Sequence, residues 1–190
     1  MNQTIDKPVV EDTKSILDRT VHARLLQDIE RVAEIANVPV HMLHFSMKNY
    51  CSASEIEWVK QFNTHVKEET AGYCMTKVDD PSIRMQAMTA ALLRNFIDAR
   101  VVTVETMLEW AEEDDPPIPT VLLVPNFSIV LKGDSFPSWK VQKLYDILMT
   151  RYVSGKQTVV YIESLSTLAK NYGQQFAEFI KTRWVHEDKK

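Results

Sequence analysis

The chain has 190 residues, of which 45% are hydrophobic and 25% charged, and this ordinary globular balance excludes a wholly disordered or fibrous protein. Its formal net charge of -4 argues against a generally basic nucleic-acid binder, and its 4 glycines leave little material for glycine-rich nucleotide loops. No apolar run approaches the roughly 18 residues of a membrane span. The polar start and the lack of a disulfide framework, with only Cys51 and Cys74, predict a cytoplasmic protein.

The N-terminal part of the chain predicts a polar tail over residues 1–14, followed by an amphipathic helix over 15–36. Its apolar side chains recur at helical spacing, and they are Ile16, Val21, Leu25, Ile29 and Val32. Two interpretations are open, since such a helix can cover the core or dock into a groove of a partner. We treat residues 1–37 as the tail with its helix and 38–190 as the main domain.

Strands and helices then alternate along the chain. After the connector that begins near Pro39, Ser52 and Glu55 form a capping box that predicts a helix over 52–69. Asp80 and Pro81 suit the start of a second helix, and Ser138 and Gly155 suit the two ends of another. Strands are expected at 72–76, 99–104, 120–124 and 157–162, with a short helix through Trp110 and two helical stretches at the end. This order predicts a three-layer α/β fold with a parallel sheet between helices.

The first strand-to-helix turn, residues 76–84, is where such a sheet places a ligand. The turn contains no glycine, so its backbone N–H groups cannot wrap closely around a phosphate. It carries Asp79 and Asp80, whose carboxylates would repel a phosphate there, whereas Lys77 precedes the helix and is badly placed for one. The turn therefore argues against a conventional nucleotide site.

Several segments carry a resemblance to a known family. They are VPVHMLHFSMKNYCSASE (38–55), MQAMTAALLRNFI (85–97), VLLVPNF (121–127) and WKVQKLYDILMTRYVSGKQTVVYIES (139–164). In this order the segments resemble the AAA+ domain of bacterial replicative-helicase loaders and the related insertion-sequence transposition ATPases, which are P-loop proteins. The resemblance spans roughly residues 38–185. It implies a role in DNA replication and a replicative helicase as partner.

The positions where the family holds ATP differ in this sequence. The phosphate loop GxxGxGK[ST] corresponds to the turn with Asp79 and Asp80, and the acidic pair that organises Mg²⁺ corresponds to Pro125 and Asn126. The polar sensor residue corresponds to Glu163. The resemblance with these departures implies a pseudo-ATPase with no cofactor, which acts as a loader or regulator of the helicase. Two alternatives are a nucleotide hydrolase with an unorthodox phosphate site and a purely protein-binding regulator of a host protein. A phage or plasmid setting would suit such a shortened form.

Basic residues gather toward the C-terminal end, because residues 140–190 carry nine Lys and Arg against five Asp and Glu. An anionic partner such as single-stranded DNA and a solvated helix face are both open interpretations. The candidate phosphate contacts are Lys140, Lys143, Arg151, Lys156, Lys170, Lys181 and Arg183. In the family, an arginine in the last helical region can reach a neighbouring subunit's nucleotide, and Arg183 falls at that place in an oligomer. A solvated C-terminal arginine is the other interpretation, and the simpler one.

Other candidate sites have a simpler structural interpretation. Phe127, Phe136 and Trp139 flank a loop with Lys132 and Lys140, so they could stack on bases or belong to the core. His41 and His44 lack further metal ligands nearby, and we predict no metal site. Cys51 or Cys74 with His65 could form a nucleophile pair, but buried cysteine is commoner. The acidic run from Glu112 to Asp115 is expected to be a solvated loop.

Overall fold

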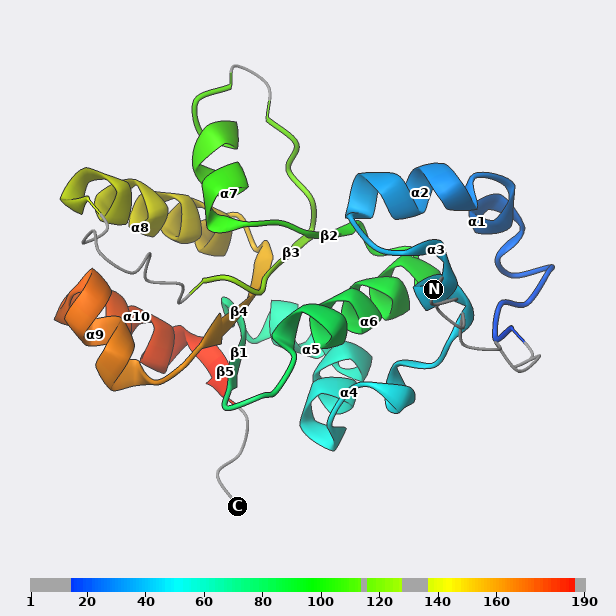
Figure 1. Ribbon diagram of the computed structural model, residues 1–190, viewed down its shortest axis with the longest axis horizontal. Coiled ribbons are helices and arrows are strands. Elements are labelled where there is room, and N and C mark those ends of the chain that lie inside the picture. Colours follow the sequence, from blue (N-terminus) through cyan, green and yellow to red (C-terminus); the bar gives the residue numbers. More distant parts are fainter. Residues whose placement is uncertain (1–14, 114–115, 128–136, 187–190) are drawn as a thin grey trace, which may run out of the picture.

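The computed structural model describes residues 15–113, 116–127 and 137–186, and it is built around one parallel sheet (Figure 1). Five strands lie in the order β2-β3-β4-β1-β5, and every neighbouring pair is parallel. The strands are β1 (Gly72–Thr76), β2 (Ala99–Val101), β3 (Val121–Val124), β4 (Gln157–Ile162) and β5 (Trp184–His186). The predicted α/β class and parallel sheet are confirmed.

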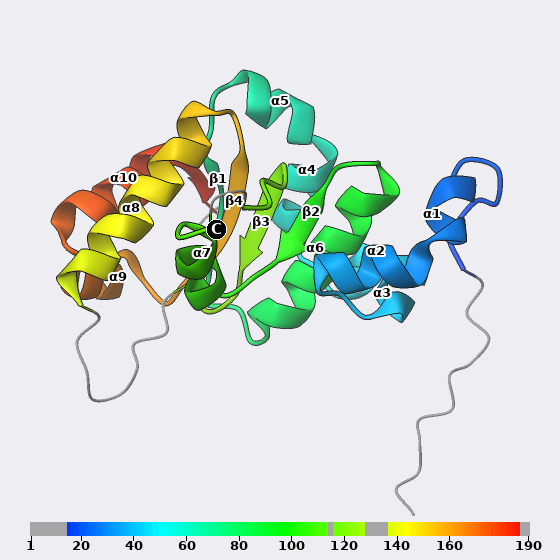
Figure 2. The same cartoon turned by 90° about the horizontal axis from the view of Figure 1, so that it is seen from above.

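Helices cover both faces of this sheet, as the three-layer prediction requires (Figure 1). One face carries α2 (Ile29–Ala36), α3 (Val40–His44), α4 (Ala53–Lys60), α5 (Phe62–Lys67) and α6 (Pro81–Arg94), with a single 3₁₀ turn at Met47–Asn49. The other face carries α7 (Val104–Trp110), α8 (Ser138–Val153), α9 (Leu165–Tyr172) and α10 (Gln174–Arg183). The short α1 (Ala23–Gln27) lies at the end of the molecule farthest from α9 and α10 (Figure 2). Among the described helices, none is long and apolar enough to cross a membrane.

The sheet divides the core into two apolar clusters, because successive side chains of a strand point to opposite faces. Tyr73 and Met75 pack on the side of α6, whereas Cys74 packs on the side of α8. In β3 the same alternation directs Leu123 to the first cluster and Leu122 to the second. Strands with burial on both faces read as continuous apolar runs, which is why β3 and β4 could be predicted.

Helix starts follow the predicted capping residues with one exception. The Ser52 hydroxyl accepts the N–H of Glu55 at 3.4 Å, which confirms the capping box, and Asp80 caps α6 with Pro81 in the first turn. The prediction that Ser138 caps its helix is wrong by one position. Ser138 is the first residue of α8, after Pro137, and it makes no capping hydrogen bond. Gly155, at φ +67°, follows the end of α8 as expected.

The predicted helix over residues 15–36 is corrected, because the structure has two shorter helices interrupted at Asp28. Before them, the Asp18 carboxylate accepts the N–H groups of Thr20 and Val21, both at 2.8 Å, and this holds residues 18–21 in a turn. Asp favours such turns over helix continuation since its side chain competes for local backbone N–H groups. The helix predicted over 52–69 is likewise divided into α4 and α5 at Gln61.

The segment α2 packs on the main domain. Its buried Ala33 and Ala36 belong to the first core cluster, and the Asn37 amide donates to the Val101 carbonyl oxygen at 2.9 Å. These contacts support the core-covering interpretation for this part of the predicted helix. The structure also contains α3, within the connector, and the strand β5, which pattern reasoning did not predict.

Glu55 connects the start of α4 to α6 from a fully buried position. One carboxylate oxygen accepts the backbone N–H of Ser52 at 2.7 Å, and the other accepts Nη1 of Arg84 at 3.1 Å. Burial of a carboxylate is costly unless it is paired and hydrogen-bonded, and both oxygens meet that condition here. The connector is therefore fixed against α6 by charge as well as by packing.

Candidate functional site

The carboxyl ends of three adjacent strands bring the predicted ligand-binding segments to one edge of the sheet. Thr76 at the end of β1 pairs with Ile162 at the end of β4, and Val124 at the end of β3 pairs with Val160. The segments that follow these strands are the turn 77–80, the pair Pro125 and Asn126, and Glu163. Ligands of parallel α/β sheets bind beyond this edge, so this is the candidate site.

The turn after β1 already uses its own carboxylate at the start of α6. Oδ1 of Asp80 accepts the N–H of Ile83 at 3.0 Å, and Pro81, at the first helical position, has no N–H to offer. An anion at a helix N-terminus needs these free N–H groups. Asp79 and Asp80 are exposed and present negative charge to the same space. The turn therefore offers fewer donors and a less favourable field to a phosphate than an open helix terminus does.

Asn126, after β3, forms a bridge to the start of α7. Its Oδ1 accepts the N–H of Val104 at 3.0 Å, and its Nδ2 donates to Oε2 of Glu105 at 2.9 Å. Partial burial raises the pKa of Glu105, but hydrogen bonds from its own backbone N–H, Asn126 and Thr103 outweigh that effect and hold the pKa below its ordinary value. Both polar ends of the Asn126 amide are thus engaged in holding α7 to the strand end.

Glu163 follows β4 at the same edge and is exposed. The next residue, Ser164, starts α9, since its hydroxyl accepts the N–H of Thr167 at 3.0 Å. Together with the turn after β1, Glu163 makes the edge rich in carboxylates. Within the described ranges, however, no group of three or more His, Cys, Asp or Glu residues is arranged to hold a metal ion.

Comparison with known proteins finds similarity at the level of the fold. No protein-family model and no curated protein matches the sequence. Among solved structures, the replication initiator DnaA bound to AMPPCP and single-stranded DNA matches with a TM-score of 0.57 and 12% identity, over 77% of this chain and 50% of that one. A DNA replication initiation factor matches with 0.51 and 9%, over 76% and 49%. The DnaC helicase loader matches with 0.50 and 12%, over 74% and 94%.

The fold is AAA+-like. It resembles the folds of the DnaA and DnaC replication ATPases at low sequence identity, in agreement with the family resemblance of the sequence. The chain spans about half the length of the replication initiators that it matches, and nearly all of the DnaC chain. Within this AAA+-like fold, the carboxyl edge described above is the candidate site.

The prediction that Arg151 contacts a phosphate backbone is corrected, because its side chain is buried and only 7% exposed. Its guanidinium donates to the Thr158 hydroxyl at 3.0 Å and to the carbonyl oxygens of Pro119 and Gln157. A side chain in this position supports the α8–β4 connection and cannot reach a phosphate backbone. No sequence pattern indicates this burial, because an arginine in the last turn of a helix is usually exposed and interacts favourably with the helix dipole.

The remaining cations do not form one surface. Lys140 and Lys143 lie in the first two turns of α8, where Lys143 pairs with Glu112 at 2.7 Å. Lys156 and Arg183 directly precede β4 and β5, whose first residues lie at the amino edge of the sheet, opposite the candidate site. Near that edge, Lys181 pairs with Glu178 at 3.2 Å, and the Arg183 guanidinium lies 5.5 Å from the Tyr152 ring. Lys170 is exposed in the last turn of α9. Their role in DNA binding stays a prediction.

The predicted partner-binding residues divide by exposure. Ile16 and Val21 are 46% and 62% exposed, so both can meet a partner. The prediction that Leu25 anchors a partner is corrected, because the Leu25 side chain is buried. Ile29 and Val32 are partly buried. Sequence reasoning missed two exposed apolar residues beside them, Ile35 and Phe96. Phe96 follows α6, about 60 residues after Ile35 in the chain, and a single sequence does not show that the two residues lie at the same pocket.

Leu25, Val32, Ile35 and Phe96 lie around a pocket of about 370 Å³ between the N-terminal helices and the end of α6, whereas Ile16 and Val21 do not line it. Leu25, Val32 and Ile35 line it from one side, and Phe96 lines it from the other. The Phe96 ring also stacks on His22, with 6.2 Å between ring centroids. We call this pocket and its exposed rim the N-terminal surface.

Other candidate residues take structural positions. Phe127 is fully buried and stacks on Tyr172, so it belongs to the core, whereas Trp139 is 58% exposed beside Lys140. Burial raises the pKa of the Cys51 and Cys74 thiols to about 12, which disfavours the thiolate that a nucleophile needs. The predictions for the tail 1–14 and for Asp114, Asp115, Lys132 and Phe136 concern residues outside the described ranges.

Proposed function

We propose that this protein is a non-catalytic, AAA+-like accessory protein of DNA replication that binds a replicative helicase as a loader or regulator. The proposal rests on one combined observation: the fold is similar to that of a helicase loader, and the carboxyl edge of its sheet is occupied by contacts of the protein's own side chains. The fold is similar to that of the DnaC helicase loader over 94% of the loader chain. At the carboxyl edge, the helix terminus is capped by Asp80 and the strand end is bridged by Asn126. A protein with this fold and these contacts would act through protein surfaces.

The absence of ATP turnover is the first part of this proposal to test. We expect no change in the melting temperature with millimolar Mg·ATP, because the turn after β1 offers few backbone N–H donors and carries two exposed carboxylates. A ligand present at 100 times its dissociation constant would stabilise the folded state by about 2.7 kcal/mol, which a thermal-shift assay detects. A saturable rise would contradict the proposal and favour a nucleotide hydrolase with an unorthodox phosphate site.

The helicase is proposed to bind the N-terminal surface. Exposed apolar residues around a pocket are typical of protein-binding sites, and Ile35 and Phe96 are 46% and 64% exposed around this one. We expect the double variant I35D/F96D to bind a replicative helicase at least tenfold more weakly than the parent chain. Biolayer interferometry with the immobilised helicase would measure the dissociation constants.

A matched control separates this effect from unfolding. Val153 is 77% exposed at the end of α8, on the other face of the sheet. The variant V153D is expected to bind the helicase like the parent chain, and circular dichroism should show equal melting temperatures for all three proteins. Full affinity in I35D/F96D would move the helicase contact to another surface. Binding to a host protein and not to a helicase would favour the regulator alternative.

A further inference from the structure

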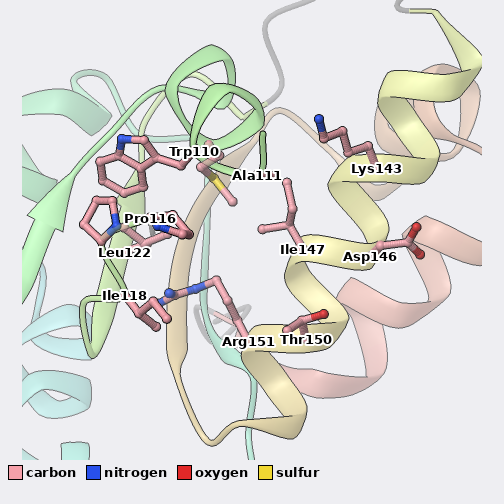
Figure 3. Close-up of a pocket in the computed structure, with 12 residues that line it drawn as sticks. Trp110, Ala111, Pro116, Ile118, Leu122, Lys143, Asp146, Ile147, Thr150 and Arg151 are labelled. Carbon is pink, nitrogen blue, oxygen red and sulfur yellow. The ribbon is translucent and has the colours of Figure 1, made fainter. Parts of the chain in front are cut away.

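A second pocket lies between α7 and α8, on the face of the sheet away from the N-terminal helices. It has a volume of about 380 Å³. Its apolar wall is formed by Trp110, Pro116, Ile118 and Leu122, and Ile147 of α8 faces this wall across the pocket (Figure 3). A concave, mostly apolar cavity of this size is typical of small-ligand sites, which also contain a few polar groups that fix the ligand's orientation.

The polar group at one end of this pocket is the guanidinium of Arg151. Within the described part of the chain it makes four hydrogen bonds, all to neutral oxygens, namely the Thr158 hydroxyl and the carbonyls of Pro119 and Gln157. No carboxylate lies within ion-pair distance of it among the residues that the structure describes. The hydrogen-bond partners of this positive charge are thus neutral dipoles, without a carboxylate in direct contact.

The surroundings leave this charge incompletely balanced. Burial lowers the pKa of Arg151 to about 10, although Asp98 acts in the opposite direction. Two other charged side chains line the pocket. Lys143 is paired with Glu112 at 2.7 Å, and Asp146, which accepts Nε2 of Gln142 at 2.9 Å, points away from the apolar wall (Figure 3). A ligand that brings a negative charge to the Arg151 end would supply the missing opposite charge.

We propose that the α7–α8 pocket binds a small carboxylate with an apolar body. The carboxylate lies toward Arg151 and Thr150, and the body lies between Trp110 and Ile147. This site is separate from the carboxyl edge of the sheet and from the N-terminal surface, so the proposal does not depend on the proposed function. The ligand joins α7 to α8, and it therefore stabilises the face of the sheet that these helices cover.

A pair of probes of equal shape tests the role of charge. We expect 4-phenylbutyrate to shift the indole N–H resonance of Trp110 in a titration followed by NMR, while the resonance of the exposed Trp139 does not move. The neutral analogue 4-phenylbutanamide should bind at least tenfold more weakly, because it brings no charge to Arg151. Equal affinities for the two probes would overturn the proposal, and so would an unmoved Trp110 resonance at tens of millimolar 4-phenylbutyrate.

Two variants then locate the site without touching the buried arginine. Ile118 is 65% exposed at the pocket wall, so I118D is compatible with folding, and its carboxylate should weaken 4-phenylbutyrate binding at least tenfold. The variant V153D carries the same change on the same face of the sheet, outside the pocket, and should bind the probe like the parent chain. Undiminished binding to I118D, or equal loss in both variants, would contradict the assignment.

Discussion

Replacement of Gly72 by alanine is expected to prevent folding. Gly72 begins β1, at φ +152°, and a Cβ atom built there would lie 1.8 Å from the backbone oxygen of Thr158 in β4. Both atoms belong to paired central strands, so neither can move without loss of the β1–β4 ladder. The strain should exceed the roughly 5–15 kcal/mol by which a domain of this kind is stable. Circular dichroism of G72A should show no cooperative thermal transition.

Gly155 offers the matched control for this substitution. It also has a positive φ, +67°, but nothing lies within 4 Å of a Cβ atom built on it. The variant G155A should therefore fold and lose only about 1 kcal/mol, the ordinary cost of a left-handed conformation for an alanine. A folded G72A with a similarly small loss would show that β1 and β4 are not held at the separation described.

Replacement of Glu55 by alanine is expected to cost about 3 kcal/mol of unfolding free energy. The side chain is fully buried, and its loss removes the acceptor of the Ser52 N–H and breaks the Glu55–Arg84 ion pair. Breaking a buried pair by removal of one partner costs roughly 3–5 kcal/mol, and the 25% exposure of Arg84 places the effect at the lower end. Urea denaturation followed by tryptophan fluorescence would measure the change.

Glu57, on the same helix, provides the control for this experiment, because it carries the same charge as Glu55 but is exposed. Its side chain is 54% exposed and lies 3.9 Å from Lys60, a surface pair of little energetic value. The variant E57A should change the unfolding free energy by no more than about 0.5 kcal/mol. A loss in E55A as small as that of E57A would contradict the structural role assigned to the buried carboxylate. The variant E55Q, which keeps the length and an acceptor, should recover part of the loss.

The sequence was most informative where local physics determines the structure. The capping box at Ser52 and Glu55 and the Asp80–Pro81 helix start depend on neighbouring residues, and the structure confirms them. The sequence also predicts β3 and β4, because strands buried on both faces of a sheet are mostly apolar, although β4 also buries the polar Gln157 and Thr158. The order of these elements was sufficient to predict a parallel sheet.

The failures of sequence reasoning arise from contacts between distant segments. Arg151 lies in the core because Pro119, 32 residues away along the chain, and Thr158 in the next strand supply acceptors for its guanidinium. Similarly, β5 has only three residues, too few for a periodic pattern, and it forms because β1 offers an edge to Trp184. The apolar side chains of residues 15–36 fit a helical period, but the turn at Asp18 competes with the helix locally.

The bridge made by Asn126 limits how this chain can change by mutation. A single-base change can convert asparagine to aspartate, and in P-loop NTPases an aspartate after a strand holds Mg²⁺. Here the Nδ2 group lies 2.9 Å from a carboxylate oxygen of Glu105, so aspartate would set two negative charges against each other. It would also remove the donor that holds α7 in place. An evolutionary path toward an acidic residue at position 126 therefore passes through a less stable intermediate unless Glu105 changes first.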